Sequence, residues 1–217
     1  MDIISLSIEE VKKELRDKGT KLVFVLGKTC TGKSTFAREI SKMDYFHLEM
    51  DCVVLESVAD KFNIKNRDEA FLVYKGIAPF EWQESFEEAA KNLILKYIDK
   101  RKVVVDAAFA DPNVLKRIIP DRFNDGYSLI YFHPFNREFY YEGIFNRFAE
   151  DVNTEKKSFP IWLEVTPEII KDYKKNGRKG SKIFSLVKKY GDESADSSLE
   201  RFELFWKVFP KIILTGH

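Results

Sequence analysis

Five short runs of apolar residues, rich in β-branched and aromatic side chains, stand out along the chain. They cover residues 21–26, 46–50, 102–106, 127–132 and 211–215. Each run is almost continuously apolar instead of alternating with polar residues, which is typical of strands buried on both faces of a sheet. The pattern therefore predicts five strands in the interior of a parallel sheet.

Amphipathic helical patterns separate these runs, and local signals mark where two of the helices begin. The helix expected over 7–18 opens with Ser7, and Glu10 follows three residues later. Ser85 and Glu88 repeat this spacing ahead of another amphipathic stretch. A serine followed three residues later by glutamate is a capping box, in which each side chain binds a backbone N–H of the first turn. Both positions therefore predict the start of a helix.

Other helix signals involve proline. Asp111-Pro112 and Thr166-Pro167 each combine an N-cap residue with proline in the first turn. Ser197 with Glu200 predicts the start of a last helix, and Pro210 its end. Strands that alternate with helices favour an α/β fold with a parallel sheet and helices on both faces.

The composition indicates one globular domain over 1–217. Hydrophobic residues make up 44% and charged residues 33% of the 217 positions, so the chain can bury a core and stay in solution. This balance excludes a disordered tail and a collagen-like fibre. The polar, glycine-punctuated stretch 151–196 differs from the rest, and we expect it to be an insertion or a mobile lid instead of a second domain.

Charge and cysteine content narrow the class further. The formal net charge is +1, which argues against a strong polyanion binder, and two cysteines cannot form a disulfide framework. No apolar run approaches the roughly 20 residues that span a bilayer. The first ten residues include acids and lack the apolar run of a signal peptide. We therefore expect a cytoplasmic protein that does not bind membranes.

The first apolar run leads into a phosphate-binding loop, the P-loop pattern G-x-x-x-x-G-K-[ST]. The residues expected to contact the nucleotide are Gly27, Lys28, Thr29, Cys30, Thr31, Gly32, Lys33, Ser34 and Thr35. Glycines let successive N–H groups turn inward around a phosphate, and the following helix contributes its positive N-terminus. Lys33 is expected to reach the β- and γ-phosphates and the Ser34 hydroxyl to bind Mg²⁺.

The rest of the chain indicates which kind of P-loop protein this is. No N-K-x-D guanine motif occurs, and Asp106, at the end of the third run, is followed by Ala107 and Ala108. A water-activating glutamate is therefore missing beside the expected metal-binding aspartate. This favours phosphoryl transfer to an acceptor over hydrolysis.

The order of these parts resembles the P-loop small-molecule and nucleotide kinases, the group of adenylate, shikimate and nucleoside kinases that includes zeta-toxin-like and polynucleotide-kinase-like members. The resemblance implies a three-layer fold with strand order 2-3-1-4-5 and ATP at the carboxyl ends of the strands. It also implies an acceptor-binding segment at 52–100 and a helical lid at 135–196. The chain departs from the pattern in its long, lysine-rich insertion before the last strand.

The resemblance also implies roles for particular residues. A carboxylate at the end of the second strand would accept the proton of the attacking hydroxyl, and of Glu49 and Asp51 we expect Asp51 to do so. Asp106 would bind Mg²⁺ directly or through water. Arg137 and Arg147 lie ten residues apart, close to three helical turns, and one or both would clamp the transferring phosphate.

Two weaker signals leave alternatives open. The segment 171–182 has six basic residues and one acid, which fits either an anion-binding surface or a solvated helix face. Aromatic residues in the acceptor segment could stack on a ring or belong to the core: Tyr74, Phe80, Trp82 and Phe86. His47 and His133 have no second ligand at metal-binding spacing, so we expect no metal role for them.

Together these features predict an ATP- and Mg²⁺-dependent kinase that phosphorylates a hydroxyl of a small molecule, such as a nucleoside, sugar or nucleotide-sugar. Two alternatives stay open: a polynucleotide 5′-hydroxyl kinase and a non-catalytic ATP-binding switch. A pure switch would not need the proton acceptor or the paired arginines, and the net charge of +1 argues mildly against nucleic acid.

Overall fold

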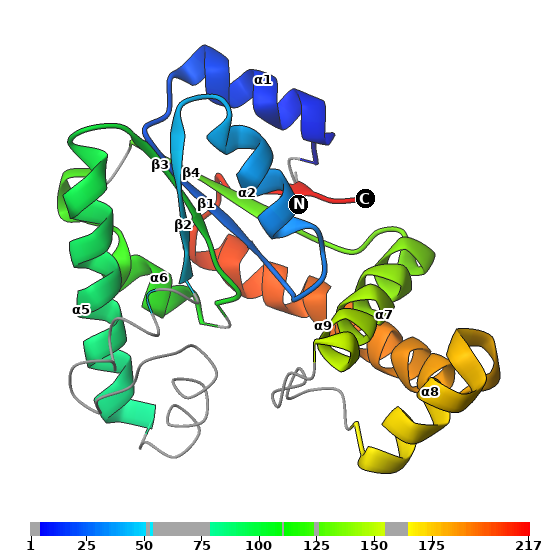
Figure 1. Cartoon of the computed structure of the whole chain (residues 1–217). Coiled ribbons are helices and arrows are strands. Elements are labelled where there is room, and N and C mark those ends of the chain that lie inside the picture. Colours follow the sequence, from blue (N-terminus) through cyan, green and yellow to red (C-terminus); the bar gives the residue numbers. More distant parts are fainter. Residues whose placement is uncertain (1–4, 51–52, 54–78, 110, 124–125, 155–164) are drawn as a thin grey trace.

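Five parallel strands form the sheet, as the computed structural model of the chain shows (Figure 1). The structure describes residues 5–50, 53, 79–109, 111–123, 126–154 and 165–217. The strand order is β2-β3-β1-β4-β5. The strands are β1 (Leu22–Gly27), β2 (Tyr45–Glu49), β3 (Lys102–Asp106), β4 (Tyr127–Phe132) and β5 (Ile213–Thr215). The predicted α/β fold and its 2-3-1-4-5 order are thus confirmed.

Helices cover both faces of the sheet (Figure 1). They are α1 (Ile8–Lys18), α2 (Lys33–Ser41), α5 (Pro79–Ile98), α6 (Pro112–Ile118), α7 (Arg137–Asn153), α8 (Pro167–Gly180) and α9 (Ile183–Val208), with a 3₁₀ turn at Asp121–Phe123. Alternate residues of β1 enter different cores, because successive side chains of a strand point to opposite faces. Phe24 packs with residues of α5, α6 and α9, whereas Val25 packs with residues of α1 and α2.

A third apolar cluster lies outside the sheet layers and joins α7, α8 and the first half of α9. Its fully buried members include Tyr140, Ile144, Phe148 and Ile183. Gly191 of α9 permits the close approach of α7, because a Cβ atom there would lie 2.5 Å from the Tyr141 ring. Most of the segment expected to be a lid therefore forms a small helical body with its own core. Its movement as a lid stays a prediction.

Three of the five predicted helix starts are confirmed. The Ser7 side chain caps α1 in a full capping box, Asp111 accepts a bond from the backbone of α6, and Thr166 does the same for α8. The other two are wrong. The helix expected to start at Ser85 is α5, which begins at Pro79, and Ser197 lies inside α9, a continuous helix of 26 residues.

Within the part of the chain that the structure describes, no helix combines the length and the apolar character needed to cross a bilayer.

Candidate functional site

The P-loop joins the carboxyl end of β1 to the first turn of α2, at the edge of the sheet where all five strands end. Gly27, with φ 137°, ends β1 so close to β4 that a Cβ atom would lie 2.4 Å from the Phe132 carbonyl oxygen. Gly32 caps α2 at φ 94°, and Cys30 between them has φ 65°. Positive φ angles at such positions turn backbone N–H groups toward a common centre, which creates an anion-binding nest.

Lys33 is held inside this loop. Its side chain is buried and its Nζ donates a hydrogen bond to the Lys28 carbonyl oxygen at 3.0 Å. The Thr31 hydroxyl donates to the same carbonyl at 2.8 Å. The loop is therefore already folded around the ammonium group that would meet the phosphates.

Asp106 lies beside the loop at the end of β3, next to β1 on one side and to Glu49 of β2 on the other. Burial raises the pKa of Asp106, but interactions with His47, Lys33 and Ser34 outweigh it and hold that pKa below its ordinary value. The carboxylate is thus charged at neutral pH and adjacent to the Ser34 hydroxyl. These are the two side chains that the sequence suggested for Mg²⁺.

His47 is a neighbour of this carboxylate that the sequence did not indicate. Its Nε2 lies 3.8 Å from the Asp106 Oδ2 atom, and both side chains are largely buried. The pairing of β2 with β3 creates this contact, and the two residues are far apart in the sequence. Among the described residues there is no group of three or more His, Cys, Asp or Glu side chains that could hold a metal by itself. Any cation here would need phosphate or water oxygens as further ligands.

Arg147 reaches the loop from α7. The helix packs against the loop at Gly143, where a Cβ atom would lie 3.1 Å from the Cys30 carbonyl oxygen. Burial raises the pKa of the Cys30 thiol to about 11, although Lys33 and Arg147 nearby act in the opposite direction. The Arg147 Nε donates to the Asp151 carboxylate at 3.4 Å, and Asp151 is buried. A buried carboxylate thus holds a half-exposed arginine beside the phosphate loop.

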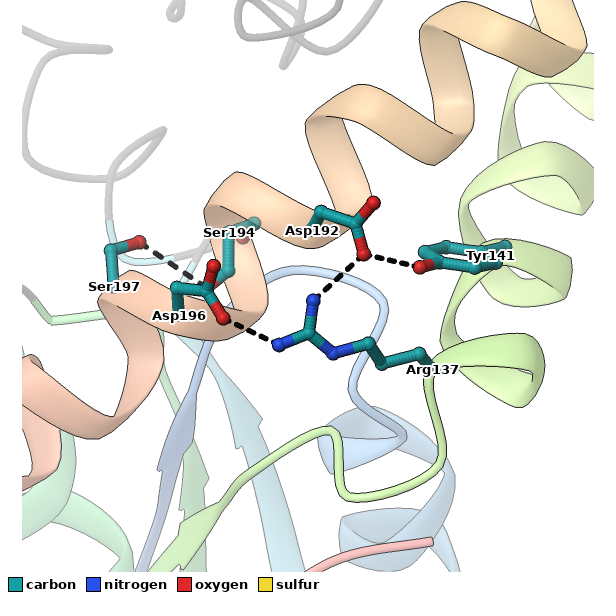
Figure 2. Close-up of polar contacts among 6 residues, drawn as sticks. All are labelled: Arg137, Tyr141, Asp192, Ser194, Asp196 and Ser197. Atoms are coloured by element: carbon teal, nitrogen blue, oxygen red, sulfur yellow. Dashed lines mark hydrogen bonds and ion pairs between the residues drawn. The ribbon is translucent and has the colours of Figure 1, made fainter.

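Arg137, the first residue of α7, has different partners. Its guanidinium donates to Asp192 at 2.7 Å and to Asp196 at 2.5 Å, both on α9 (Figure 2). The Tyr141 hydroxyl donates to the same Asp192 carboxylate. The two arginines that the sequence paired therefore serve different contacts. Arg147 lies near the loop, whereas Arg137 ties the start of α7 to α9.

Helix α9 adds two further polar side chains near the loop. The Lys28 Nζ donates to the Ser197 hydroxyl at 2.9 Å. The pKa of Lys28 is lowered, first by burial and then by the nearby Arg201. Nothing in the local sequence identifies Arg201, because only the packing of α9 against the rest of the fold brings it here. Four cations therefore gather around the loop, together with the Glu200, Asp151 and Asp106 carboxylates; the cations are Lys28, Lys33, Arg147 and Arg201.

An aromatic group lies at the other side of the loop. The His217 ring would be 2.9 Å from a Cβ atom at Gly32, and its centroid is 4.6 Å from that of Phe139. Phe139 and Phe135 are about half exposed, at 49% and 52%. No local sequence signal indicated this group, because its members come from α7, the segment before it and the residues after β5.

Several predicted residues lie outside this geometry. Asp51, the expected proton acceptor, and Tyr74 are not among the described residues, and neither are the side chains of Phe80 and Trp82. Phe86 is buried and packs edge-on against Phe109, so it belongs to the core.

Comparison with known proteins found no similar sequence among family models or curated proteins and a distant similarity among solved structures. No family model matches the sequence, and no curated protein matches it. Among solved structures, the chain is similar to shikimate kinase from Acinetobacter baumannii in complex with shikimate. The identity is 9%, the TM-score is 0.40, and the match covers 91% of this chain and 98% of that one. The fold assignment therefore rests on the strand order and the loop geometry of this chain itself.

Proposed function

We propose that this protein is a kinase that uses ATP and Mg²⁺ to phosphorylate a hydroxyl group of a small molecule. One observation carries the proposal: the buried Lys33 ammonium, the Ser34 hydroxyl and the charged Asp106 carboxylate lie together at the carboxyl edge of a parallel sheet. In open α/β sheets this edge is where ligands bind.

The phosphates are bound by the backbone N–H groups of the loop and by Lys33, which together match the charge and shape of a polyphosphate. Ser34 and Asp106 fit Mg²⁺, because both offer the oxygen ligands that this ion prefers and the lowered pKa keeps the carboxylate ionised. When bound, the ion supplies charge neutralisation on the β- and γ-phosphates.

The transfer step leaves negative charge on the migrating group. Arg147 is held beside the loop by the buried Asp151, and it would stabilise this charge with a planar, two-pronged guanidinium. Asp51 would take the proton of the attacking hydroxyl, a role that rests on the sequence alone. Because Ala107 follows Asp106, the chain has no glutamate directly after this aspartate in the sequence to activate water. This favours a hydroxyl acceptor.

The nucleoside would extend from the loop toward His217, Phe135 and Phe139. Exposed rings next to a phosphate site offer a stacking surface for a flat base. Stacking tolerates different bases, so this surface by itself does not select ATP over GTP.

Calorimetry with Mg·ATP tests the nucleotide site. Lys33→Met keeps the apolar stem but removes the charge, and we expect it to abolish measurable binding. Lys42→Met, at the exposed end of the same helix, is the matched control and should bind as the unaltered protein does. Unchanged affinity in Lys33→Met would rule out the P-loop as the triphosphate site.

A panel of nucleosides, sugars and nucleotide-sugars tests the transfer, with ADP formation as the readout. Acceptor-dependent ADP formation supports the kinase. Tight Mg·ATP binding without ADP formation for any acceptor would instead favour a nucleotide-binding switch.

A further inference from the structure

The α8–α9 hairpin carries a concentration of positive charge that phosphoryl transfer does not explain. Residues 171–189 contain eight lysines or arginines and one acid, Asp172, which gives a net charge of +7. Since the whole chain is +1, the other 198 residues carry −6. The near-neutral total therefore conceals a strongly polarised molecule.

Three lysines of the first turns of α8 are exposed. Ile169, Ile170 and Tyr173 pack against the cluster shared with α7 and α9. Lys174 and Lys175 are exposed and follow the exposed Lys171 by three and four residues, so both lie on the same side of the helix as Lys171. Figure 1 shows α8 and the start of α9 at the far end of the helical body, away from the sheet.

Part of this charge is neutralised within the molecule, since Lys189 pairs with Glu193 at 4.0 Å. Arg178 is paired with Glu142 and lies over the Phe145 ring. The Asp172 carboxylate accepts bonds from the Lys182 backbone N–H and from Asn176. Among the described residues, no acidic side chain forms an ion pair with Lys171, Lys174, Lys175, Lys182 or Lys188. Like charges at helical spacing repel one another, so such a cluster costs stability unless a partner supplies the counter-charge.

An exposed aromatic side chain accompanies the cations at the start of α9. Phe184, in the first turn of α9, is 43% exposed and stands two residues after Lys182 and four before Lys188. Cations that track a phosphate backbone, combined with a ring on which a base can stack, are the features by which proteins hold single strands. A duplex would keep its bases away from the ring.

We propose that this hairpin binds single-stranded nucleic acid. One base of the bound strand would stack on Phe184, and its phosphates would contact five lysines: Lys171, Lys174, Lys175, Lys182 and Lys188. The inference concerns binding alone and does not rest on the proposed transfer reaction. It can be measured without ATP, so its failure and the failure of the kinase assignment are distinguishable.

The test is fluorescence anisotropy of a labelled 15-nucleotide oligothymidine with the full chain at a series of salt concentrations. The triple variant Lys171→Ala, Lys174→Ala, Lys175→Ala removes three phosphate contacts. The log–log salt slope should become shallower by about 2, because each contact to a single strand contributes about 0.7. Affinity at 50 mM salt should fall at least tenfold. The matched control is Lys13→Ala, Lys100→Ala, Lys116→Ala, which makes the same change in net charge at exposed positions elsewhere and should bind normally.

Phe184→Leu tests the base contact separately, since it keeps apolar volume but removes the ring. We expect it to weaken oligothymidine binding about fivefold or more without a change in the salt slope. The proposal is overturned if the unaltered protein does not bind at 50 mM salt, or if both triple variants lose affinity equally. Equal affinity for a duplex of the same length would also overturn it. So would lysine-dependent binding to phosphatidylserine vesicles without binding to the oligonucleotide, which would make the partner a membrane surface.

Discussion

Arg137 and Arg147 lie on the same helix, α7, but their replacement by alanine should affect turnover differently. Arg147→Ala removes the guanidinium beside Cys30 and should slow the chemical step while it leaves Mg·ATP affinity within a few-fold. Arg137→Ala removes the ion pairs to Asp192 and Asp196 and should leave turnover within a few-fold. The sequence alone predicted only that at least one of them is catalytic.

The size of the Arg147 effect follows from its place next to the P-loop, where the proposed function puts the phosphates. Removal of an arginine that stabilises the transition state costs on the order of 10³ in turnover, which corresponds to about 4 kcal/mol. A second effect comes from Asp151, which is 1% exposed and loses one charged hydrogen-bond partner. That loss costs about 1–3 kcal/mol of stability. It lowers the melting temperature by several degrees but leaves the protein folded at assay temperature.

Three further variants separate these contributions. Arg147→Lys keeps the charge near Asp151 but loses the planar guanidinium with its two parallel N–H donors. Compared with Arg147→Ala, it should therefore restore stability more than turnover. Asp151→Asn keeps the arginine but loosens its anchor, so it should lower stability and affect turnover less than Arg147→Ala does. Arg137→Ala should lower the melting temperature by no more than a few degrees, because exposed ion pairs contribute little.

The assay is ADP formation with an acceptor found in the panel, at a temperature well below each variant's melting point. Slow background ATP hydrolysis is a substitute if no acceptor is found. Calorimetry with Mg·ATP gives the affinities in parallel. The reasoning is refuted if Arg147→Ala turns over within threefold of the unaltered protein, or if Arg137→Ala loses as much as Arg147→Ala.

Three other outcomes are expected. Asp51→Asn should retain ATP binding and lower transfer by roughly 10²–10⁴, as for loss of a general base, and a larger effect of Glu49→Gln would show that the other carboxylate accepts the proton. Asp106→Asn should raise the Mg²⁺ concentration needed for half-maximal turnover, and a titration identical to that of the unaltered protein would count against its role as a metal ligand. In a Cys52→Ser background, Cys30 should react with iodoacetamide at pH 8 roughly 100-fold more slowly than a free thiol. The reason is that burial raises the pKa of Cys30 from 9.0 to about 11, which leaves little of the reactive thiolate. A rate equal to that of a free thiol would show that Cys30 is not buried in solution.

Much of the fold could be read from the sequence because its signals are local. Continuous apolar runs predicted all five strands to within about two residues, since buried parallel strands need apolar side chains on both faces. The Ser7, Asp111 and Thr166 caps were found because a cap involves only neighbouring residues. The P-loop is equally local, because its spacing and its glycines fix the path of one short segment.

Local sequence signals gave a wrong helix start where packing against distant parts of the chain decides the structure. Ser197 and Glu200 have the spacing of a capping box, yet α9 runs through them because Val187, Ser194 and Phe202 bury one continuous face. The capping-box spacing occurs inside helices as readily as at their ends, so only packing decides between the two.

The candidate site divides in the same way. Lys33 and Ser34 were predicted from one motif, and helical spacing suggested that Arg137 and Arg147 point in broadly the same direction. The partners that separate the two arginines, Asp192 and Asp196 for Arg137 and the loop for Arg147, come from distant segments. Spacing along a helix gives a direction but does not specify what lies in that direction. The sequence by itself thus determined the strands and the phosphate loop, whereas the charged and aromatic surroundings of that loop depend on long-range packing that only the tertiary structure decided.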